Sequence, residues 1–486
     1  MSEQKKPPKS RVFFVGMKLL HKPGNKPLQE KNSFFHTYYK WVLWLSLSLY
    51  FFTSYLITTN PNTAPTSPNT SSHVSNSESH AVPRAVIDST TNSLGGVTLH
   101  TRQHFQLTNG LVLEFISTRF VAGVLKNLKM FVYELPPKFN TGWLANKRCS
   151  NHLFASEVAI HRALLTSEVR TFDPYEADFF FVPVYVSCNF SAVNGFPAIG
   201  HARSIISSAV NLVSTEYPFW NRSKGRDHVF VASHDFGACF HSLEDAAIAN
   251  GIPQILKNSI VLQTFGVVHR HPCQDVENVV IPPYVSPESV RSTLENFPVN
   301  GPREIWVFFR GKMELHPKNI SGRFYSRRVR TEIWRKFNGD RRFYLQRHRF
   351  SGYQLEIARS VFCLCPLGWA PWSPRLVESV ALGCVPVIIA DGIRLPFSST
   401  VRWSEISLTV AERDVGKLGK ILERVAATNL SDIQRNLWDP RTRQALLFNE
   451  EMEYGDATWQ VLVSLSEKLH RSHRRSSASD ESESDT

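Results

Sequence analysis

The stretch from Cys363 to Phe397 reads CLCPLGWAPWSPRLVESVALGCVPVIIADGIRLPF. It contains a short apolar run, a Pro/Gly-rich turn, a helix-like segment that carries Glu378, and a β-branched run that ends at Asp391-Gly392. This order is typical of a βαβ unit, whose loops collect polar groups at one edge of a parallel sheet. Anionic ligands bind at that edge in α/β folds. The stretch therefore predicts an α/β enzyme that handles a nucleotide-bearing substrate.

Strand-like and helix-like segments alternate on both sides of this unit. Val329, Ile333 and Phe337 have helix spacing, whereas ADFFFVPVYV is a continuous apolar run that indicates a buried strand. We expect strands at 129–135, 177–186, 228–233, 261–265, 278–281, 304–309, 342–345, 361–364 and 385–389, and helices at 157–165, 201–216, 353–359, 374–382 and 411–427. The alternation predicts two parallel α/β domains, 116–297 and 298–470, that face each other across a cleft.

The N-terminal region has the composition of a membrane anchor and a stem. Residues 41–59 carry no charge, and as a helix they would span roughly 28 Å, enough for a thin bilayer. Residues 1–40 hold nine Lys/Arg against two Asp/Glu, and the positive-inside rule places such a tail in the cytosol. Residues 60–115 form a stem that begins rich in Ser, Thr, Asn and Pro, and residues 471–486 a disordered tail. We expect a single-pass type II protein of the Golgi membrane.

The cysteines and glycosylation motifs agree with a lumenal location. Seven cysteines are compatible with up to three disulfides and one free thiol in an oxidising compartment. A zinc site is the alternative, but the sequence contains no Cys-x2-Cys pair. Asn-x-Ser/Thr sequons occur at Asn69, Asn189, Asn221, Asn319 and Asn429.

Most of the net charge of +13 comes from two segments. Residues 1–40 are one, and residues 310–349 are the other, with thirteen Lys/Arg against three Asp/Glu. In the second segment Arg327, Arg328, Arg330 and Arg335 are expected on a solvated helix face. The alternative is that they attract an anionic ligand such as a sugar nucleotide, a uronate or an acidic polysaccharide. Nucleic acid is not an expected partner, because the sequence lacks a recognisable nucleic-acid-binding motif.

Several separated motifs resemble one known family. They are MFVYELP at 130–136, YEADFFFVP at 175–183, GRDHVFV at 225–231, HDFG at 234–237, FFRG at 308–311 and the block 373–397. In this order they resemble the exostosin domain of glycosyltransferase family 47, over residues 129–430. Within the family, the chain is most similar to the plant branch of glucuronoxylan synthesis, of the irregular-xylem/fragile-fiber type. The resemblance implies a GT-B fold and an inverting transfer from a nucleotide sugar.

The helix expected at 374–382 carries the candidate donor-binding residues. Ser373 and Arg375 stand at its start, where free N–H groups and the helix dipole favour a diphosphate. Glu378 lies among apolar neighbours and would bind ribose hydroxyls, with a salt bridge to Arg375 as the alternative. Arg310 at the end of a strand is a second diphosphate candidate, and Gly311 would let the backbone approach the phosphate. A surface ion pair or a solvated side chain is the alternative for either arginine.

The catalytic base is expected at the end of the strand 228–233. An inverting transfer needs a base within hydrogen-bond reach of the acceptor hydroxyl. Asp235 is the first candidate and His234 the second, because they follow the carboxyl end of that strand. Glu134, at the end of the first strand, is a third. A turn aspartate and a buried core histidine are the competing interpretations for the HDFG motif.

We expect no metal and no other cofactor. Manganese-dependent transferases commonly carry Asp-x-Asp, and no two aspartates stand two apart here; Glu176-x-Asp178 and Asp275-x-Glu277 come nearest. Cationic side chains and a helix terminus would then stabilise the leaving diphosphate. One motif departs from the family, because Gly368-Trp369-Ala370-Pro371 stands where many members have Gly-Asp-x-Pro. An aromatic ring that could stack on a sugar replaces an aspartate that could touch one, which leaves the sugar's identity open.

Taken together, the sequence predicts a Golgi glycosyltransferase. It would move glucuronic acid or xylose from a UDP-sugar to hemicellulose, with glucuronoxylan of the secondary cell wall as the leading acceptor and other synthase subunits as possible partners. The alternative is a non-catalytic polysaccharide-binding scaffold of a xylan synthase complex. A glycoside hydrolase is disfavoured, because an arginine-framed helix start suits a diphosphate better than a pair of catalytic carboxyl groups.

Overall fold

The computed structural model describes residues 44–46, 48–49, 125, 127–192, 195–314, 325–347 and 352–469. The chain divides into two compact units, 1–97 and 98–486. In the first unit residues 44–46 and 48–49 are helical. The described residues contain no helix that is both long and apolar enough to span a bilayer. Most of the expected anchor at 41–59, and the tails and stem around it, lie outside the described residues.

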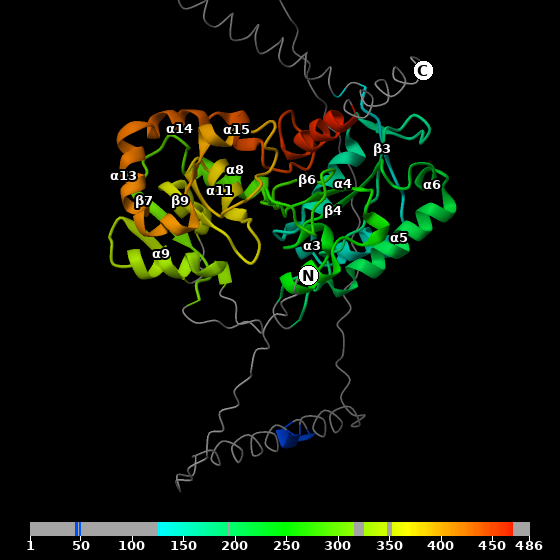
Figure 1. Ribbon diagram of the computed structural model, residues 1–486, viewed down its shortest axis with the longest axis horizontal. Helices are drawn as coiled ribbons and strands as arrows, with labels where there is room; N and C mark the ends of the chain where they lie inside the picture. Colours follow the sequence, from blue (N-terminus) through cyan, green and yellow to red (C-terminus); the bar gives the residue numbers. More distant parts are fainter. Residues whose placement is uncertain are drawn as a thin grey trace, which may run out of the picture. The chain divides into compact units, whose positions relative to one another are not determined.

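A six-stranded sheet forms the N-terminal part of the second unit (Figure 1). Its order is β2-β1-β3-β4-β5-β6, and every neighbouring pair is parallel. The strands are β1 Met130–Val132, β2 Arg170–Thr171, β3 Phe179–Phe181, β4 His228–Ala232, β5 Ile260–Gln263 and β6 Val279–Val280. The α-helices of this half are α3 Arg148–Asn151, α4 Ser156–Thr166, α5 Ala202–Glu216, α6 Phe219–Ser223, α7 Glu244–Asn250 and α8 Pro287–Asn296.

A five-stranded sheet forms the C-terminal part, in the order β11-β10-β9-β7-β8, again entirely parallel. The strands are β7 Ile305–Arg310, β8 Phe343–Gln346, β9 Ser360–Pro366, β10 Val385–Ile389 and β11 Leu408–Thr409. The helices are α9 Val329–Phe337, α10 Tyr353–Ala358, α11 Pro374–Ala381, α12 Trp403–Ile406, α13 Leu418–Thr428, α14 Leu430–Leu437, α15 Pro440–Gln444 and a last helix at 457–469. The expected parallel α/β class is confirmed.

The observed strands are shorter than the apolar runs that predict them. The run 177–186 forms a strand only over Phe179–Phe181, because Pro183 has no N–H to donate to the ladder. The chain then turns away, and the N–H of Tyr185 donates to the carbonyl of Phe139 at 2.8 Å. The two-residue edge strands β2 and β11 are too short to show a period in the sequence.

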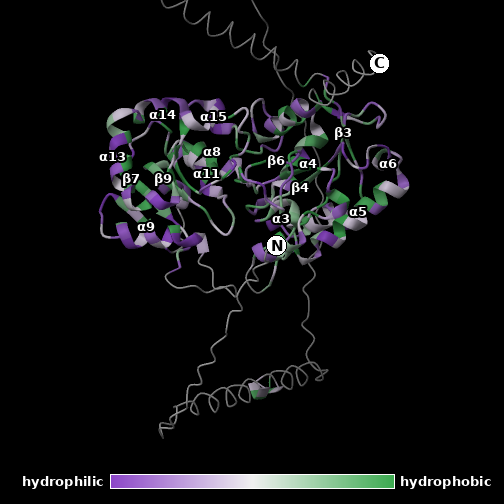
Figure 2. Ribbon diagram, viewed as in Figure 1, coloured by the Kyte–Doolittle hydropathy of each residue, from purple (hydrophilic) through white to green (hydrophobic). Residues whose placement is uncertain are grey.

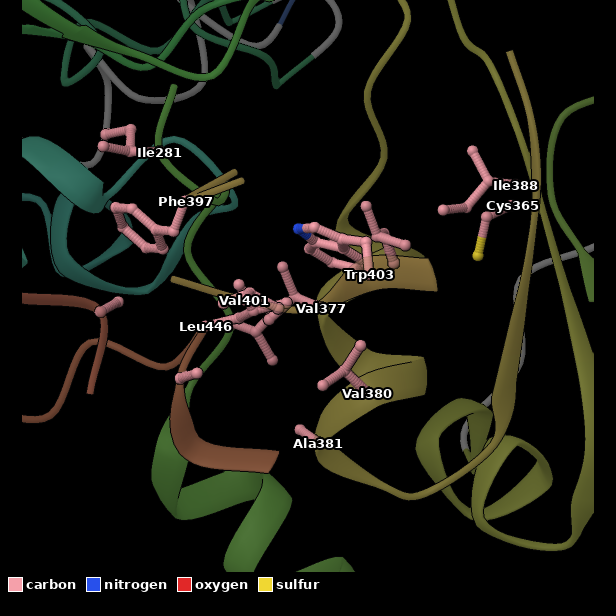
Figure 3. Close-up of a cluster of buried hydrophobic side chains, with 14 of the residues drawn as sticks. Ile281, Cys365, Val377, Val380, Ala381, Ile388, Phe397, Val401, Trp403 and Leu446 are labelled. Carbon is pink, nitrogen blue, oxygen red and sulfur yellow. The ribbon is translucent and has the colours of Figure 1, made fainter. Parts of the chain in front are cut away.

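The core of the C-terminal sheet is sealed by α11. Val377 and Val380 are both completely buried and lie near Trp403 (Figure 3). Burial of one such side chain stabilises the fold by about 1.5–3 kcal/mol. Strands of both sheets are mainly hydrophobic, whereas the helix surfaces carry many hydrophilic residues (Figure 2). This packing fixes α11, and with it the residues at its N-terminal end.

Loops at the carboxyl ends of the two sheets contact each other. The N–H of Val268, after β5, donates to the carbonyl of Gly392, after β10, at 2.8 Å. In return, the N–H of Arg394 donates to the carbonyl of Gly266 at 2.9 Å. Trp372, between β9 and α11, donates its indole N–H to the carbonyl of Asp235 at 3.3 Å. Because parallel strands present functional groups at their carboxyl ends, these contacts bring the candidate residues of the two halves together.

Candidate functional site

The strand order of the second sheet reverses between β7 and β9. β8 follows β7 and pairs on one side of it, whereas β9 pairs on the other side. Ligands of open α/β sheets bind outside the carboxyl ends of the strands at such a reversal. Arg310 is the last residue of β7 and Gly311 follows it, while β9 ends at Pro366, ahead of the loop to α11. The predicted donor-binding residues therefore do converge at one crevice.

Two buried guanidinium groups, from Arg330 and Arg375, flank Gly311. A Cβ atom on Gly311 would lie 3.1 Å from Nη2 of Arg375 and 3.4 Å from Nη1 of Arg330. Only 6 % of Arg330 and 5 % of Arg375 is exposed. Both side chains donate to main-chain carbonyls, Arg330 to those of Pro366 and Leu367, and Arg375 to those of Leu364 and Arg310. The absence of a side chain at Gly311 leaves room beside both groups.

The two guanidinium groups lack an ion-paired carboxylate within the described part of the chain. Burial lowers the pKa of Arg330, and the charge of Arg375 lowers it further. A buried cation without a counter-ion is costly, so the arrangement favours a bound anion. The interpretation of Arg330 as part of a solvated face is wrong. Its position three residues before Ile333 and seven before Phe337 places it on the inward face of α9, a signal that the sequence contains.

Arg310 is buried in an ion pair with Glu356 of α10. Tyr344 donates its hydroxyl to the same Glu356 oxygen at 3.0 Å. The carbonyl of Arg310 accepts a hydrogen bond from Arg375. The charge of Arg310 is therefore compensated inside the protein, and the residue supports Arg375 from the end of β7.

Ser373 and Glu378 lie at opposite ends of the first turn of α11. Ser373 caps the helix, and its hydroxyl accepts from the N–H of Arg375 at 3.3 Å. Burial raises the pKa of Glu378 to about 7, while the charge of Arg375 and side-chain hydrogen bonds from Gln354 and Tyr353 oppose the shift. Glu378 is thus only half ionised near neutral pH. The sequence does not predict the two α10 partners, because they come from another helix.

His234 and Asp235 follow β4, as predicted, but their surroundings differ. The ring of His234 stacks on Phe154 with centroids 4.6 Å apart, and burial, with a contribution from the charge of His152, lowers its pKa to about 4. His234 is therefore neutral at physiological pH. Burial raises the pKa of Asp235 to about 6, and its carboxylate has no hydrogen-bond partner among the described residues. Asp235 is the better placed of the two to accept a proton.

Glu134 does not join this group. Its side chain is 87 % exposed and lies 3.8 Å from Arg170. Asp178, from the Glu176-x-Asp178 pair, accepts from the N–H of Lys129 at 2.8 Å, which makes it part of the strand framework.

An aromatic and cationic group borders the crevice. Trp369 is 39 % exposed, and its ring meets that of Tyr325 edge-on, with centroids 5.0 Å apart. The ammonium of Lys312 lies 4.6 Å from the Tyr325 ring centroid and 5.3 Å from that of Trp369. Trp369 therefore presents a partly exposed ring where a sugar could stack.

The cysteines form the expected three disulfides. The pairs are Cys149–Cys188, Cys239–Cys273 and Cys363–Cys384. Cys365 is a buried free thiol, and burial raises its pKa to about 11. This thiol is therefore unreactive at physiological pH.

The sequons differ in accessibility. Asn221 and Asn429 are exposed, whereas Asn189 is half-buried. The side-chain amide of Asn221 donates to the carbonyl of Ser214 at 3.0 Å. Asn69 and Asn319 lie outside the described residues.

Comparison with known proteins identifies the family. Residues 125–425 match the model of the Exostosin GT47 domain. The chain is 65 % identical to the probable glucuronoxylan glucuronosyltransferase IRX7 of Arabidopsis thaliana over 454 residues, which cover 92 % of this chain and 98 % of that protein. A second protein of that name and plant is 60 % identical, over 90 % of this chain and 88 % of its own. The chain belongs to the Exostosin GT47 domain family.

More distant likenesses occur among proteins of solved structure. A probable glucuronosyltransferase of Oryza sativa subsp. japonica is still a sequence relative, 61 % identical over 72 % of this chain and 81 % of its own. The HepE protein of Anabaena in complex with UDP and glucose matches 71 % of this chain and 99 % of its own, with 9 % identity and a TM-score of 0.31. At that score the structural likeness carries no argument about the fold.

Proposed function

We propose that this chain is an inverting glycosyltransferase of xylan synthesis. It moves glucuronic acid, or alternatively xylose, from a UDP-sugar onto hemicellulose, with glucuronoxylan of the secondary cell wall as the leading acceptor. Family membership and the names of the two Arabidopsis relatives support the reaction class and the polymer. The rest of the proposal follows from the crevice between β7 and β9.

One observation carries the proposal: two buried arginines without an ion-paired carboxylate flank a glycine at the strand reversal. Arg330 and Arg375 would hold the diphosphate beside Gly311, together with the N–H groups at the Ser373 end of α11. Glu378 would accept hydrogen bonds from the ribose hydroxyls in its ionised form. Cations already fixed by main-chain carbonyls need no rearrangement as charge develops on the leaving UDP.

The chemistry would proceed by a direct displacement. Asp235 takes the proton from the acceptor hydroxyl while that oxygen attacks the anomeric carbon, and the bond to UDP breaks on the opposite side. Neutral His234 lies beside Asp235 and could only donate or accept a hydrogen bond. Because the arginines supply positive charge at the diphosphate, we propose that the reaction needs no divalent metal.

The wider setting is also part of this proposal. Two parallel sheets whose carboxyl-end loops touch support a GT-B arrangement, with the acceptor on the side of residues 116–297 and the donor on that of 298–470. The uncharged segment 41–59 behind a basic tail supports anchoring in the Golgi membrane as a single-pass type II protein. Other polysaccharide synthase subunits are possible partners there.

Calorimetry with UDP in the presence of a chelator tests the proposal. The wild type should bind UDP, and Arg330→Gln should bind it about 10- to 150-fold more weakly, because a charge-assisted hydrogen bond contributes about 1.5–3 kcal/mol. Arg335→Gln is the matched control, since Arg335 lies on the same helix and pairs with exposed Glu332 at 3.2 Å. Arg330→Lys, which keeps the charge, separates an effect on UDP from a folding defect.

Two results would contradict the proposal. Wild-type protein that takes up no UDP without metal would remove the diphosphate site. Binding of xylo-oligosaccharides without any affinity for UDP would instead support a scaffold. Equal UDP affinity in the Arg330→Gln and Arg335→Gln variants would show that the crevice between β7 and β9 is not the donor site.

A further inference from the structure

A second charged site lies on the outer side of α9. A cavity of about 260 Å³ opens between the start of α9 and the turn Glu412–Lys417. Its charged lining residues are Arg327, Arg328, Lys336, Arg413, Glu332 and Glu412. Four cations and two carboxylates give the lining a formal charge of +2. The cavity therefore favours an anion.

Both acidic residues of the lining are engaged elsewhere. Glu412 accepts from the Arg327 guanidinium at 3.1 Å and from the N–H of Asp391 at 2.8 Å. Glu332 pairs with Arg335, which is not part of the lining, at 3.2 Å. These contacts hold the carboxylates in place and satisfy them. The excess positive charge of the cavity is therefore available to a ligand.

The size of the cavity excludes a nucleotide sugar. Pockets that enclose drug-sized ligands measure about 300–1,000 Å³, and the 260 Å³ here suits one anionic sugar unit. The site is also separate from the diphosphate crevice, because Arg330 faces Gly311 from the inner side of α9. The ligand is thus small, or is one unit of a longer chain that lies across the surface.

The surroundings of the cavity favour a sugar polymer. Asp391, which holds Glu412, follows the carboxyl end of β10, so the cavity lies at the same sheet edge as the donor crevice. Tyr325 is two residues from Arg327, and it contacts the partly exposed ring of Trp369. Aromatic rings beside cations suit a chain that alternates apolar pyranose faces with carboxylates.

We propose that this cavity binds the carboxylate of a uronic acid unit on a polysaccharide that lies across the carboxyl edge of the second sheet. The identity of the polymer, an acidic xylan, rests on the proposed function. The electrostatic capture of a uronate does not. The cavity would hold a glucuronate-bearing chain near the donor site, where previously added acid groups distinguish acidic from neutral chains.

Binding of two matched oligosaccharides to the full chain tests the inference. One probe is a xylo-oligosaccharide that carries glucuronic acid, and the other is an unsubstituted one of equal length. The double variant Lys336→Gln/Arg413→Gln removes two cations from the lining. Arg402→Gln/Arg435→Gln is the control, because it removes the same charge from exposed pairs with Glu405 and Asp432 elsewhere in that half.

The wild type should bind the acidic probe more tightly than the neutral one, and the difference should shrink with added salt. The cavity variant should lose about fivefold in affinity for the acidic probe only, while the control stays unchanged. Equal affinity of the wild type for both probes, or equal losses in cavity and control variants, would overturn the inference. A parallel UDP titration keeps the two proposals apart, because a failed UDP titration contradicts the proposed function alone.

Discussion

Burial decides what each charged residue can do in this protein. Arg330 and Arg335 lie five positions apart on α9, yet Arg330 is 6 % exposed beside Gly311 and Arg335 pairs with Glu332 on the surface. A surface pair contributes little to stability, about 0–1 kcal/mol. A buried cation must have strong partners or a bound anion. Residues of the same type therefore have different roles because of their environment.

The pKa of Asp235 makes a prediction about pH. Burial raises this pKa to about 6, and the carboxylate accepts a proton only when it is ionised. Activity should therefore be full well above pH 6 and fall as the pH decreases through 6, with kcat/KM losing about tenfold per pH unit below it. Asp235→Asn should lower kcat by about 10²- to 10⁴-fold. Both are measured as initial rates of UDP release.

Asp432→Asn provides the control for that experiment. Asp432 is an exposed carboxylate paired with Arg435, and its loss should leave the rate and the pH profile unchanged. A wild-type profile that stays flat between pH 5 and 7, or an active Asp235→Asn variant, would assign the base to another residue.

At the scale of elements, caps and buried faces determine where the helices begin. Ser373, Ser286 and Asp439 each accept a hydrogen bond from a main-chain N–H at the start of their helices. Proline follows each of them, and its fixed φ suits the first helical position. These local signals predict α8, α11 and α15 independently of the rest of the chain.

The last helix, 457–469, depends on a buried cap. Asp456 is completely buried, and its carboxylate accepts from the N–H groups of Trp459 and Glu453, both at 2.9 Å. Asp456→Ala would leave these donors buried and unsatisfied. We expect it to lower the free energy of unfolding by about 2 kcal/mol, as measured by urea denaturation.

Asp439→Ala is the comparison for this cap. Asp439 caps α15 through the N–H groups of Arg441 and Thr442 but is exposed, so water can replace the lost carboxylate. Its loss should cost about 1 kcal/mol. Equal effects of the two substitutions would show that burial of the Asp456 cap adds nothing.

At the scale of the whole second unit, the candidate site is assembled from two sheets. Asp235 belongs to the loop after β4, and Arg375 belongs to α11 after β9. Trp372 links the two regions through its indole N–H and through its edge-on contact with Phe154, at a centroid distance of 5.7 Å. The separation of base and diphosphate site therefore depends on a few contacts between loops.

Trp372→Phe should weaken this link without removing the ring. Loss of one hydrogen bond costs about 1 kcal/mol, so we expect kcat to fall about fivefold while the affinity for UDP is kept. Trp403→Phe is the matched control, because Trp403 donates to the Pro396 carbonyl at 2.8 Å within one half of the unit. It should lower stability and leave kcat unchanged. A fall in UDP affinity in Trp372→Phe would show that this contact shapes the donor site instead.

The candidate site could be predicted from the sequence only in part. Ser373, Arg375 and Glu378 are close in sequence and share one helix, so spacing is enough to group them. The ion pair of Arg310 with Glu356 joins residues 46 apart, and the contacts of Glu378 with Tyr353 and Gln354 come from another helix. No local pattern reports such partners, and they decide which charge remains for a ligand.

The sequence by itself determined the parallel α/β class, the order of the main strands and helices, and the resemblance to the family. These properties follow from hydrophobic periodicity, turn residues and motifs, which act between neighbours along the chain. Only the tertiary structure decided that Arg330 faces Gly311, that Asp235 lies beneath Trp372, and which cysteines pair. Those facts depend on contacts between residues far apart in sequence, because burial and charge compensation are set by the packed neighbours and not by the local order of residues.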